Sequence, residues 1–518
     1  MLVDLRIRTS AAARRRMRLP GMLAVAGLLL SGCGGLKLPS GAPTAPALLP
    51  TSTLAPLRTV PATATEATST PPVTAAPVVA TGTVAPGTSS GLLTCSAMPP
   101  DPRPAATAAS AAKTGDGRIV YVNTDGNIAL TDQTGANIQL VTTDANTVDD
   151  KSLLKVYANP TFSTDGQSLA FVGYTTISGT NTVTQTLYSS PARQKAPLTR
   201  LYTTSQDTLP YMDWSPDGRT IAFLTLNSSN GAIRMVNPSG GQVTVVEQGS
   251  TAYYDWRLDS AAVLTHMSGS PATNADAHLS IVDTATDKPA RLASLPGNFK
   301  APQYSPGGKY AAFVTRTNNN DDLVLADNTG QPICSVAPLD TGASFAWAPD
   351  GSGIAWIDSA LPLSNPAPLF LYNLKDGSRS QLHDSAIAFF WAPDSNRLAV
   401  YSVVSSGTPT DFGGGTISST VPSSSPLLRI QIVDADGSGI LTAADTYPTQ
   451  GVVNVLSYFD QYAHAVTPWS PDSLHLVFTS ASHTRPDIDM VVASLDSSGA
   501  TASLKRIASG VVAFWSPR

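Results

Sequence analysis

The hydrophobic positions of this chain follow one pattern that recurs eight times: an aromatic residue, a short polar turn, and a run in which apolar and polar residues alternate. The clearest copy reads Trp-Ser-Pro-Asp-Gly-Arg-Thr-Ile-Ala-Phe over 214–223. Alternation with a period of two predicts a strand with one buried face. Pro-Asp-Gly predicts a tight turn, because proline presets φ and glycine tolerates positive φ. The copies begin at Phe162, Trp214, Trp256, Tyr304, Trp347, Trp391, Trp469 and Trp515.

One repeat contains four strand-like runs before the next aromatic residue. Turn residues separate the runs, so neighbouring strands are expected to pair as hairpins. Four antiparallel strands per repeat form the blade of a β-propeller, which makes the fold all-β. The alternative, unrelated strands of a β-sandwich, does not account for one motif at near-constant spacing. In the repeat that begins at Trp214 the runs are Tyr211–Trp214, Thr220–Leu226, Ala232–Val236 and Val243–Val246.

The two ends of the chain predict how the ring closes. The last copy, at Trp515, supplies a first strand only, whereas Gly115–Val122 resembles a second strand that lacks its first. Joining the two completes one blade and protects strand edges. We therefore expect an eight-bladed β-propeller of four-stranded antiparallel blades over 114–518, closed by pairing of the C-terminal strand with the N-terminal blade. Seven blades are the alternative, if the weak copy at Trp256 is not a separate blade.

The first 32 residues predict export. Arginines precede an apolar stretch, Leu19–Leu30, that is too short to span a bilayer as a helix. It ends in Leu-Ser-Gly-Cys over 30–33, which resembles the lipobox of bacterial lipoproteins, where the cysteine is lipidated. The resemblance implies a signal peptide over 1–32, lipidation of Cys33, and a lipid anchor on the extracytoplasmic side of the cell membrane. A plain secretory signal with an incidental cysteine is the alternative.

Residues 33–113 are expected to be a disordered tether. They are rich in proline, threonine, alanine and serine, and only Lys37, Arg58 and Glu66 are charged between Gly34 and Cys95. Such a composition cannot bury enough apolar surface to offset the entropy of ordering the chain. The tether would hold the propeller away from the bilayer.

Two cysteines remain besides Cys33. Cys334 lies in a fourth strand, Gln331–Val336, which is expected on the outer rim of the ring, where a passing tether that carries Cys95 can reach it. Export permits a disulfide between the two. Two free thiols are the alternative, and the sequence leaves both open.

The charged and nucleophilic residues form no recognisable catalytic or metal site. Residues 1–32 carry six arginines and one aspartate, so the rest of the chain has a net charge of about −10. That charge disfavours nucleic acid as a partner.

The six histidines lack metal-ligand spacing. Asp434–Gly439 with Asp445 has the spacing of a calcium loop, but other repeats have hairpin turns there, so we favour a hairpin. We expect no cofactor, no metal and no catalytic residue.

The copies of Ser-Pro-Asp-Gly-Arg-x-Ile-Ala-Phe resemble the WD40-like PD40 repeat of TolB-type propellers, and the resemblance covers about 115–518. It implies that the motif is structural and carries no catalytic residue. Members of that family include a protein-interaction partner of the cell envelope and the propeller half of prolyl-oligopeptidase-type peptidases. The copies at Trp256 and Tyr304 depart from the motif, which weakens the expected register there.

Successive copies are 42–52 residues apart except for one interval of 78, which holds two insertions, Ser405–Pro426 and Thr446–Pro468. In a four-stranded meander both connections emerge opposite the Pro-Asp-Gly turns; we call these two sides the insertion face and the turn face. Because function concentrates on loops of a rigid scaffold, the insertions predict a recognition surface. Apolar residues at helical spacing in the second insertion predict a short helix that caps the ring. The candidate partner-binding residues are Tyr458, Phe459, Asp460, Tyr462, His464, Phe412 and Asp411; the alternative is that the aromatic ones pack on the ring.

Two functions fit the sequence. The first is a membrane-anchored extracytoplasmic lipoprotein whose propeller is a non-catalytic binding or scaffolding module for an envelope protein or glycan. The second is an exported glycan lyase or hydrolase that uses the propeller channel, with Asp213 and Asp255 as channel-facing acids. No cluster of acid, base and metal ligand supports catalysis, so binding is favoured. We expect a monomer.

Overall fold

The structure is a computed structural model, and its all-β architecture agrees with the expected fold class. It describes residues 92–104, 117–146, 153–177, 182–228, 230–269, 276–405, 408–410, 412, 426–481, 488–496, 499 and 502–517. The predicted signal peptide, Cys33 and most of the predicted tether lie outside these residues.

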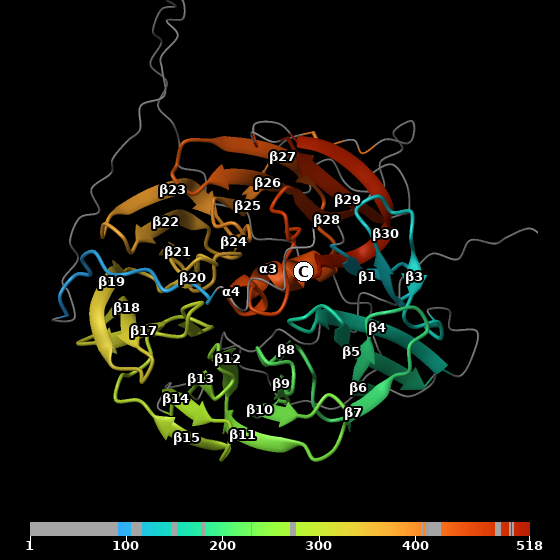
Figure 1. Cartoon of the computed structure of the whole chain (residues 1–518), viewed down its shortest axis with the longest axis horizontal. Coiled ribbons are helices and arrows are strands. Elements are labelled where there is room, and N and C mark those ends of the chain that lie inside the picture. Colours follow the sequence, from blue (N-terminus) through green and yellow to red (C-terminus); the bar gives the residue numbers. More distant parts are fainter. Residues whose placement is uncertain are drawn as a thin grey trace, which may run out of the picture.

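Six sheets of four antiparallel strands follow one another around a ring (Figure 1). The first strand of each sheet carries a motif aromatic, and the four strands pair in sequence order, which confirms the predicted blade. The strands are β4 (Leu153–Phe162), β5 (Ser168–Ile177), β6 (Val183–Pro191), β7 (Thr199–Thr204); β8 (Met212–Trp214), β9 (Ile221–Leu226), β10 (Gly231–Val236), β11 (Thr244–Gly249); β12 (Thr251–Trp256), β13 (Ala262–Ser268), β14 (His278–Asp283), β15 (Lys288–Arg291); β16 (Gln303–Tyr304), β17 (Tyr310–Thr317), β18 (Asn320–Asp327), β19 (Pro332–Leu339); β20 (Ser344–Trp347), β21 (Gly353–Ile357), β22 (Ala367–Asn373), β23 (Arg379–Ala386); β24 (Ala388–Trp391), β25 (Arg397–Val404), β26 (Leu427–Asp434), β27 (Ile440–Thr446).

The seventh sheet closes the ring and contains both ends of the propeller. Its strand order is β28-β29-β30-β1-β2-β3. The first half of β30 pairs with β29, and its second half pairs with β1, where Trp515 lies opposite Ile119. The predicted pairing of the C-terminal strand with the N-terminal blade is therefore confirmed. The strands are β28 (His475–Ala481), β29 (Ile488–Leu495), β30 (Ala502–Trp515), β1 (Ile119–Asn123), β2 (Ile128–Thr131) and β3 (Gln139–Leu140).

The strands that the structure describes form seven sheets, so the prediction of eight blades is corrected to its alternative. We expected the strand that ends at Trp515 to open a blade of its own. Instead β30 runs for 14 residues without a break, so the last repeat and the N-terminal strands share one sheet. The weak copy at Trp256 is not the cause, because β12 begins a complete four-stranded sheet.

The hydrogen bonds of the motif turn explain why its residues recur. Ser215 Oγ donates to Asp217 Oδ1 at 2.6 Å and accepts from the N–H of Thr220 at 3.0 Å. Asp217 Oδ1 also accepts from the N–H of Arg219 at 3.0 Å. Gly218 has a φ of 70°, in the left-handed region that favours glycine. The motif residues thus build the turn itself.

Three copies place serine at the left-handed position, and these serines link neighbouring sheets. Their φ values are 60–62°, a conformation that costs a non-glycine residue about 1–2 kcal/mol. Each serine hydroxyl accepts a hydrogen bond of 3.0–3.1 Å from an aspartate N–H in the preceding motif turn. The bond offsets part of the conformational cost and ties the sheets together on the turn face. The pairs are Asp217–Ser260, Asp350–Ser395 and Asp394–Ser473.

The motif aromatics pack between neighbouring sheets and form the core. Trp214 shares a buried cluster with Ala170 and Leu187 of the preceding sheet. Trp391 and Trp469 also donate their indole N–H to a carbonyl of the preceding sheet, the latter at 3.0 Å. Burial between sheets explains why an aromatic residue opens every repeat.

Residues 92–104 form a strap that crosses the rim of the ring beside β19 and β20 (Figure 1). Thr94 makes a parallel bridge with Ser335 of β19, which extends that sheet at its outer edge. Cys95 and Cys334 form a disulfide with their Cα atoms 4.9 Å apart. The strap is therefore bonded covalently to the outermost strand, which is the first of the two arrangements that the sequence left open.

Asp101 holds the strap on two motif turns of the turn face. Its carbonyl accepts from the N–H of Gly307 at 2.9 Å, and its carboxylate accepts from Ser305 Oγ at 2.6 Å. A Cβ on Gly351, whose φ is 68°, would lie 2.2 Å from the carbonyl oxygen of Asp101. Glycine at that turn therefore serves both the left-handed backbone and the close approach of the strap.

The second insertion folds into two short helices at the centre of the ring, α3 (Gln450–Ser457) and α4 (Phe459–Tyr462) (Figure 1). The predicted helix is thus present. Thr449 caps α3, since its Oγ1 accepts from the N–H of Val452 at 3.2 Å and donates to the carbonyl of Val511 in β30 at 2.7 Å. We call residues 450–465 the axial plug. No helix in the described part of the chain is long and apolar enough to cross a membrane.

The closing sheet makes Trp515 a test of the fold. Trp515→Ala removes a buried indole from the strand that joins the two ends, so it should lower the free energy of unfolding by about 3–5 kcal/mol in urea titrations. Trp515→Phe should cost clearly less than Trp515→Ala, because phenylalanine keeps an aromatic ring in the gap and the indole N–H has no hydrogen-bond partner among the described residues. Equal and small effects of both variants would contradict the closure.

Candidate functional site

The residue that precedes each motif aromatic lies near the end of its first strand, and several of these residues contact the axial plug. Thr161 Oγ1 donates to the carbonyl of Ala465 at 2.8 Å. Phe390 lies against Phe459, with the ring centroids 6.3 Å apart. Around the ring this position is polar on one side and apolar on the other. The set in chain order is Thr161, Asp213, Asp255, Gln303, Ala346, Phe390, Pro468 and Phe514.

The polar side of the ring binds the plug through side-chain amides. Gln461 donates from Nε2 to the carbonyl of Tyr254 at 2.8 Å and accepts at Oε1 from the N–H of the same residue at 3.0 Å. The amide thus pairs with β12 as a neighbouring strand would. Gln303 Nε2 donates to the carbonyl of Asp460 at 3.3 Å. These bonds satisfy backbone groups that would otherwise be buried without partners.

The apolar side of the ring packs against the other end of the plug. Phe459 lies 4.9 Å from Phe389 between ring centroids, and both rings are fully buried. Val455 and Leu456 of α3 belong to the same core cluster. The plug therefore has a polar side and an apolar side, and each contacts the matching side of the ring.

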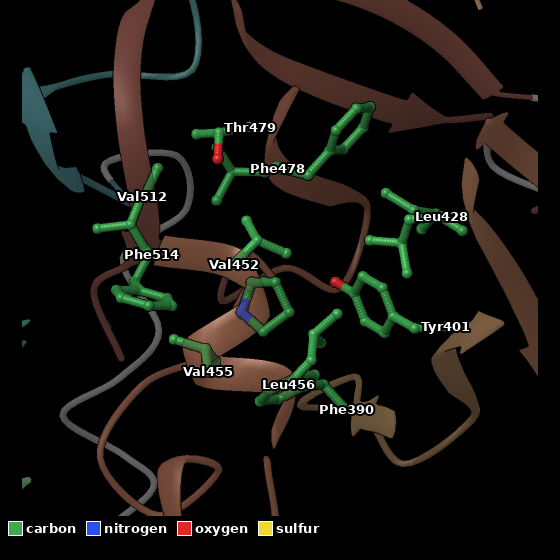
Figure 2. Close-up of a pocket in the computed structure, with 14 residues that line it drawn as sticks. Phe390, Tyr401, Leu428, Val452, Val455, Leu456, Phe478, Thr479, Val512 and Phe514 are labelled. Atoms are coloured by element: carbon green, nitrogen blue, oxygen red, sulfur yellow. The ribbon is translucent and has the colours of Figure 1, made fainter. Parts of the chain in front are cut away.

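An apolar cavity of about 30 Å³ lies between α3 and the sheets of β26, β28 and β30 (Figure 2). The hydroxyl of Tyr401 points toward its interior. A water molecule needs two to four polar partners, so a lining of this kind favours a dry cavity over a polar ligand site. The lining residues are Phe390, Tyr401, Leu428, Ile430, Val452, Val455, Leu456, Pro468, Val477, Phe478, Thr479, Val512, Ala513 and Phe514.

Two carboxylates lie side by side on the polar half of the ring. Asp213 is 8% exposed, and its Oδ1 accepts from the N–H of Trp214 at 2.7 Å. Burial, and then the charge of Asp255, raise the pKa of Asp213 well above its ordinary value of 3.8. Asp255 accepts from the N–H of Tyr304 at 2.7 Å and lies 3.1 Å from His464 Nδ1. Burial also raises the pKa of Asp255, although a protonated His464 opposes the shift.

Asp460 is a third buried carboxylate and belongs to the plug itself. It is 1% exposed, and its Oδ2 has no hydrogen-bond partner among the described residues. Burial raises the pKa of Asp460, and the charge of Lys300 opposes that shift. Lys300 is buried as well, with its ammonium group 5.5 Å from the ring centre of Tyr458. We call Asp213, Asp255, Asp460 and His464 the axial cluster.

The axial cluster has the residue types of acid–base chemistry, but two of its carboxylates are buried. Carboxylates with raised pKa values beside an imidazole are typical of proton-transfer sites. A substrate would need access to Asp213 or Asp460, and both are more than nine-tenths buried. Within the described residues, no group of three or more histidine, cysteine, aspartate or glutamate side chains is placed to hold a metal ion.

The structure separates the candidate residues of the two insertions. Tyr458, Phe459, Asp460, Tyr462 and His464 come together in the plug, where Phe459 and Asp460 are buried against the ring. This arrangement corresponds to the alternative in which the aromatic residues pack on the ring.

Phe412 lies on the other insertion, at 5.8 Å from Phe478 of the closing sheet. Asp411 and Cys33 lie outside the described residues. Asp434 and Gly439 close a hairpin between β26 and β27, and Asp445 pairs with Arg429 at 2.8 Å, so these residues serve a turn and an ion pair.

Sequence reasoning missed Tyr254, Gln303, Lys300 and Gln461 as parts of the site. The available signal was the position just before each motif aromatic, where Asp213 and Asp255 stand and Gln303 follows in the next repeat. A periodic position that is polar on one side of a ring and apolar on the other indicates an asymmetric occupant of the channel. Lys300 and Gln461 carry no such signal, because they lie outside the repeat.

No protein-family model matches the sequence, and no curated protein matches it. Solved structures that are similar include TolB from Acinetobacter baumannii, at 17% identity and a TM-score of 0.32 over 52% of this chain and 65% of that chain, a little under two thirds of its length. Oligogalacturonate lyase from Vibrio parahaemolyticus has 13% identity and a TM-score of 0.43 over 74% of this chain and 100% of that chain. The β-propeller domain of a Pyrococcus furiosus protease has 13% identity and a TM-score of 0.34 over 69% and 86%. At such values these similarities carry no argument about function.

The axial cluster predicts that Asp213 costs stability at neutral pH. A carboxyl whose pKa is raised by folding stabilises the fold below its unfolded pKa, and that contribution is lost as pH rises through the folded pKa. Asp213→Asn removes the titration, so its melting temperature should exceed that of the wild type at pH 7. The difference should shrink toward zero near pH 4. Asp384→Asn, at an exposed position, is the control and should show no such trend; a destabilised Asp213→Asn protein at pH 7 would contradict the assignment.

The amide of Gln461 predicts how firmly the plug is held. Gln461→Leu leaves the N–H and carbonyl of Tyr254 without their partner, and each unsatisfied buried group costs about 1–3 kcal/mol. The urea midpoint should therefore fall by the equivalent of at least about 2 kcal/mol. Gln450→Leu changes the same residue type at an exposed position of α3 and should leave the midpoint nearly unchanged. Similar midpoints for the two variants would show that the amide bonds do not hold the plug.

Proposed function

We propose that this chain is a lipid-anchored lipoprotein on the extracytoplasmic side of a cell membrane, whose propeller is a non-catalytic binding or scaffolding module for an envelope protein or glycan. Cys33 carries the anchor, and the proline- and threonine-rich tether sets the distance of the propeller from the bilayer.

Burial of the axial cluster is the observation that carries the non-catalytic part of the proposal. The plug fills the centre of the ring, and both Asp213 on the ring and Asp460 in the plug are buried. Propeller channels serve as sites when they are open to a ligand. With the channel occupied by the chain's own helices, recognition is left to the loops of the two faces.

The insertion face is the better candidate for recognition. Three apolar side chains are exposed there: Leu295 at 65% between β15 and β16, Leu361 at 53% between β21 and β22, and Val403 at 47% near the end of β25. Single exposed apolar residues are common on soluble proteins, but enlarged loops and apolar side chains on one face together favour a protein partner. The turn face differs, because the strap already covers part of it.

A glycan lyase or hydrolase is the second candidate, and one observation favours it. Asp213 and Asp255 are neighbouring carboxylates of raised pKa beside His464, an arrangement typical of acid–base sites. Catalysis by these residues would require that the plug leave the channel. Release of unsaturated or reducing ends from a panel of polysaccharides, abolished by Asp213→Asn, would support this candidate over binding.

Site-specific photocrosslinking tests the proposed binding face. The full chain carrying p-benzoylphenylalanine in place of Leu361 or Val403 should crosslink to one partner in native envelopes. The same group in place of Thr329, which is exposed on the turn face, is the matched control and should crosslink to that partner far less. Equal yields from the two faces would argue against recognition by the insertion face.

The anchor is tested in the same cells. The Cys33→Ser chain should move from the membrane fraction to the soluble extracytoplasmic fraction while the propeller stays folded. Retention of this variant in the membrane would refute the lipid anchor and leave the binding face to be judged by the crosslinks alone.

A further inference from the structure

The strap and the ring closure are consecutive parts of the chain, and the disulfide joins the start of the strap to β19. Going from the N-terminus, the chain reaches Cys95, crosses the turn face as far as residue 104, and enters the propeller at β1. Without the disulfide, tension on the N-terminal segment would therefore act on the strap first and on β1 next.

The strap is held by hydrogen bonds that lie one after another along its length. On the rim, Cys95 donates its N–H to the carbonyl of Ser335 at 2.8 Å, and Ser335 donates back to Leu93 at 2.9 Å. Farther along, Met98 donates to the carbonyl of Leu374, and Asp101 bonds to the motif turns. A pulled chain loads such bonds one after another, so each must resist the force with little help from the rest.

The strand β1 is the part of the ring that such tension would reach next. It pairs with β30 on one side and with β2 on the other, and it holds the two ends of the propeller together. Removing β1 would open the ring where the two ends of the propeller pair in one sheet.

The disulfide offers a different path for the load. Cys334 lies in β19, which pairs with six residues of β18 and belongs to a sheet far from the ring closure. A force that enters at Cys95 passes through the covalent bond into β19, so the segment from residue 96 to β1 stays free of tension. The sequence separation of 239 between the two cysteines is what moves the point of attachment to another sheet.

We propose that the Cys95–Cys334 disulfide is the load-bearing junction between the tether and the propeller, and that it shields the ring closure from tension. The role rests on the proposed anchor, since tension arises when the chain is held at the membrane and the propeller holds a partner. It assigns a mechanical function to the disulfide and separates it from the general stabilisation that any crosslink gives.

Single-molecule force measurements on the full chain test the proposal directly. One handle is attached at the N-terminus and the other at position 205, through Ser205→p-azidophenylalanine on the exposed connection after β7. Cys33→Ser removes the remaining thiol. The oxidised protein should show no extension step before the ring unfolds.

The Cys95→Ala/Cys334→Ala variant should behave differently. Its first event should occur at lower force and release the chain between residues 95 and 117, about 22 residues with an extended length of at most about 75 Å. Ring unfolding should then follow at a lower force than in the oxidised protein. Wild type reduced with dithiothreitol gives the same comparison if the double variant folds poorly.

Asp101→Ala in the oxidised protein is the matched control. It weakens the strap without changing the junction, so the first rupture force should match that of the oxidised wild type. A strap-length step in the oxidised protein, or its absence after reduction, would overturn the proposal. The measurement uses no membrane and no partner, so its failure is distinguishable from failure of the lipid anchor or of the binding face.

Discussion

The match between the axial plug and the ring is the constraint on which the centre of this molecule depends. A propeller places one residue of every first strand near the axis, and here those residues are polar on one side and apolar on the other. The plug presents Gln461 and His464 to the polar side and Phe459 to the apolar side. A uniform ring would leave either the amides or the aromatic rings of the plug without suitable partners, because buried polar groups need hydrogen bonds and buried rings need apolar contact.

This match has an electrostatic cost, because it keeps carboxylates of the axial cluster away from water. The role of the axial cluster is therefore the point on which the function of this protein depends. Asp213, Asp255 and Asp460 are carboxylates whose pKa values are raised by loss of contact with water, and they share only partial compensation from His464 and Lys300. Groups that cost stability are found preferentially at sites that bind or react. In the observed arrangement the plug keeps them from solvent, so the two proposed functions differ in whether the plug stays in place.

Much of the fold was predictable, because the structural role of each motif position restricts which residue types can stand there. Trp214, Pro216 and Gly218 each occupy a position that only a few residue types satisfy: a gap between sheets, a preset turn and a left-handed backbone. The blade count was not predictable, since nothing in residues 502–515 indicates that β30 passes unbroken from one set of strands to the next. The helix at 450–457 was predictable from its apolar spacing, but its burial was not. From the sequence alone, Phe459 and Asp460 could equally be surface residues.

By itself, the sequence determined the repeating blade and the residues that build each turn, because those depend on contacts between neighbours in one repeat. It also determined the closure by the chain ends, because the incomplete copies at the two ends complement each other. Tertiary structure alone decided where the inserted segments lie and what they cover. Gln461 meets Tyr254 across 207 residues of sequence, and Cys95 meets Cys334 across 239. Neither pairing follows from the periodicity of the sequence, because a residue outside the repeat has no repeat position that fixes its partner. The place of an inserted segment is set by whichever surface of the finished ring satisfies both its polar and its apolar groups.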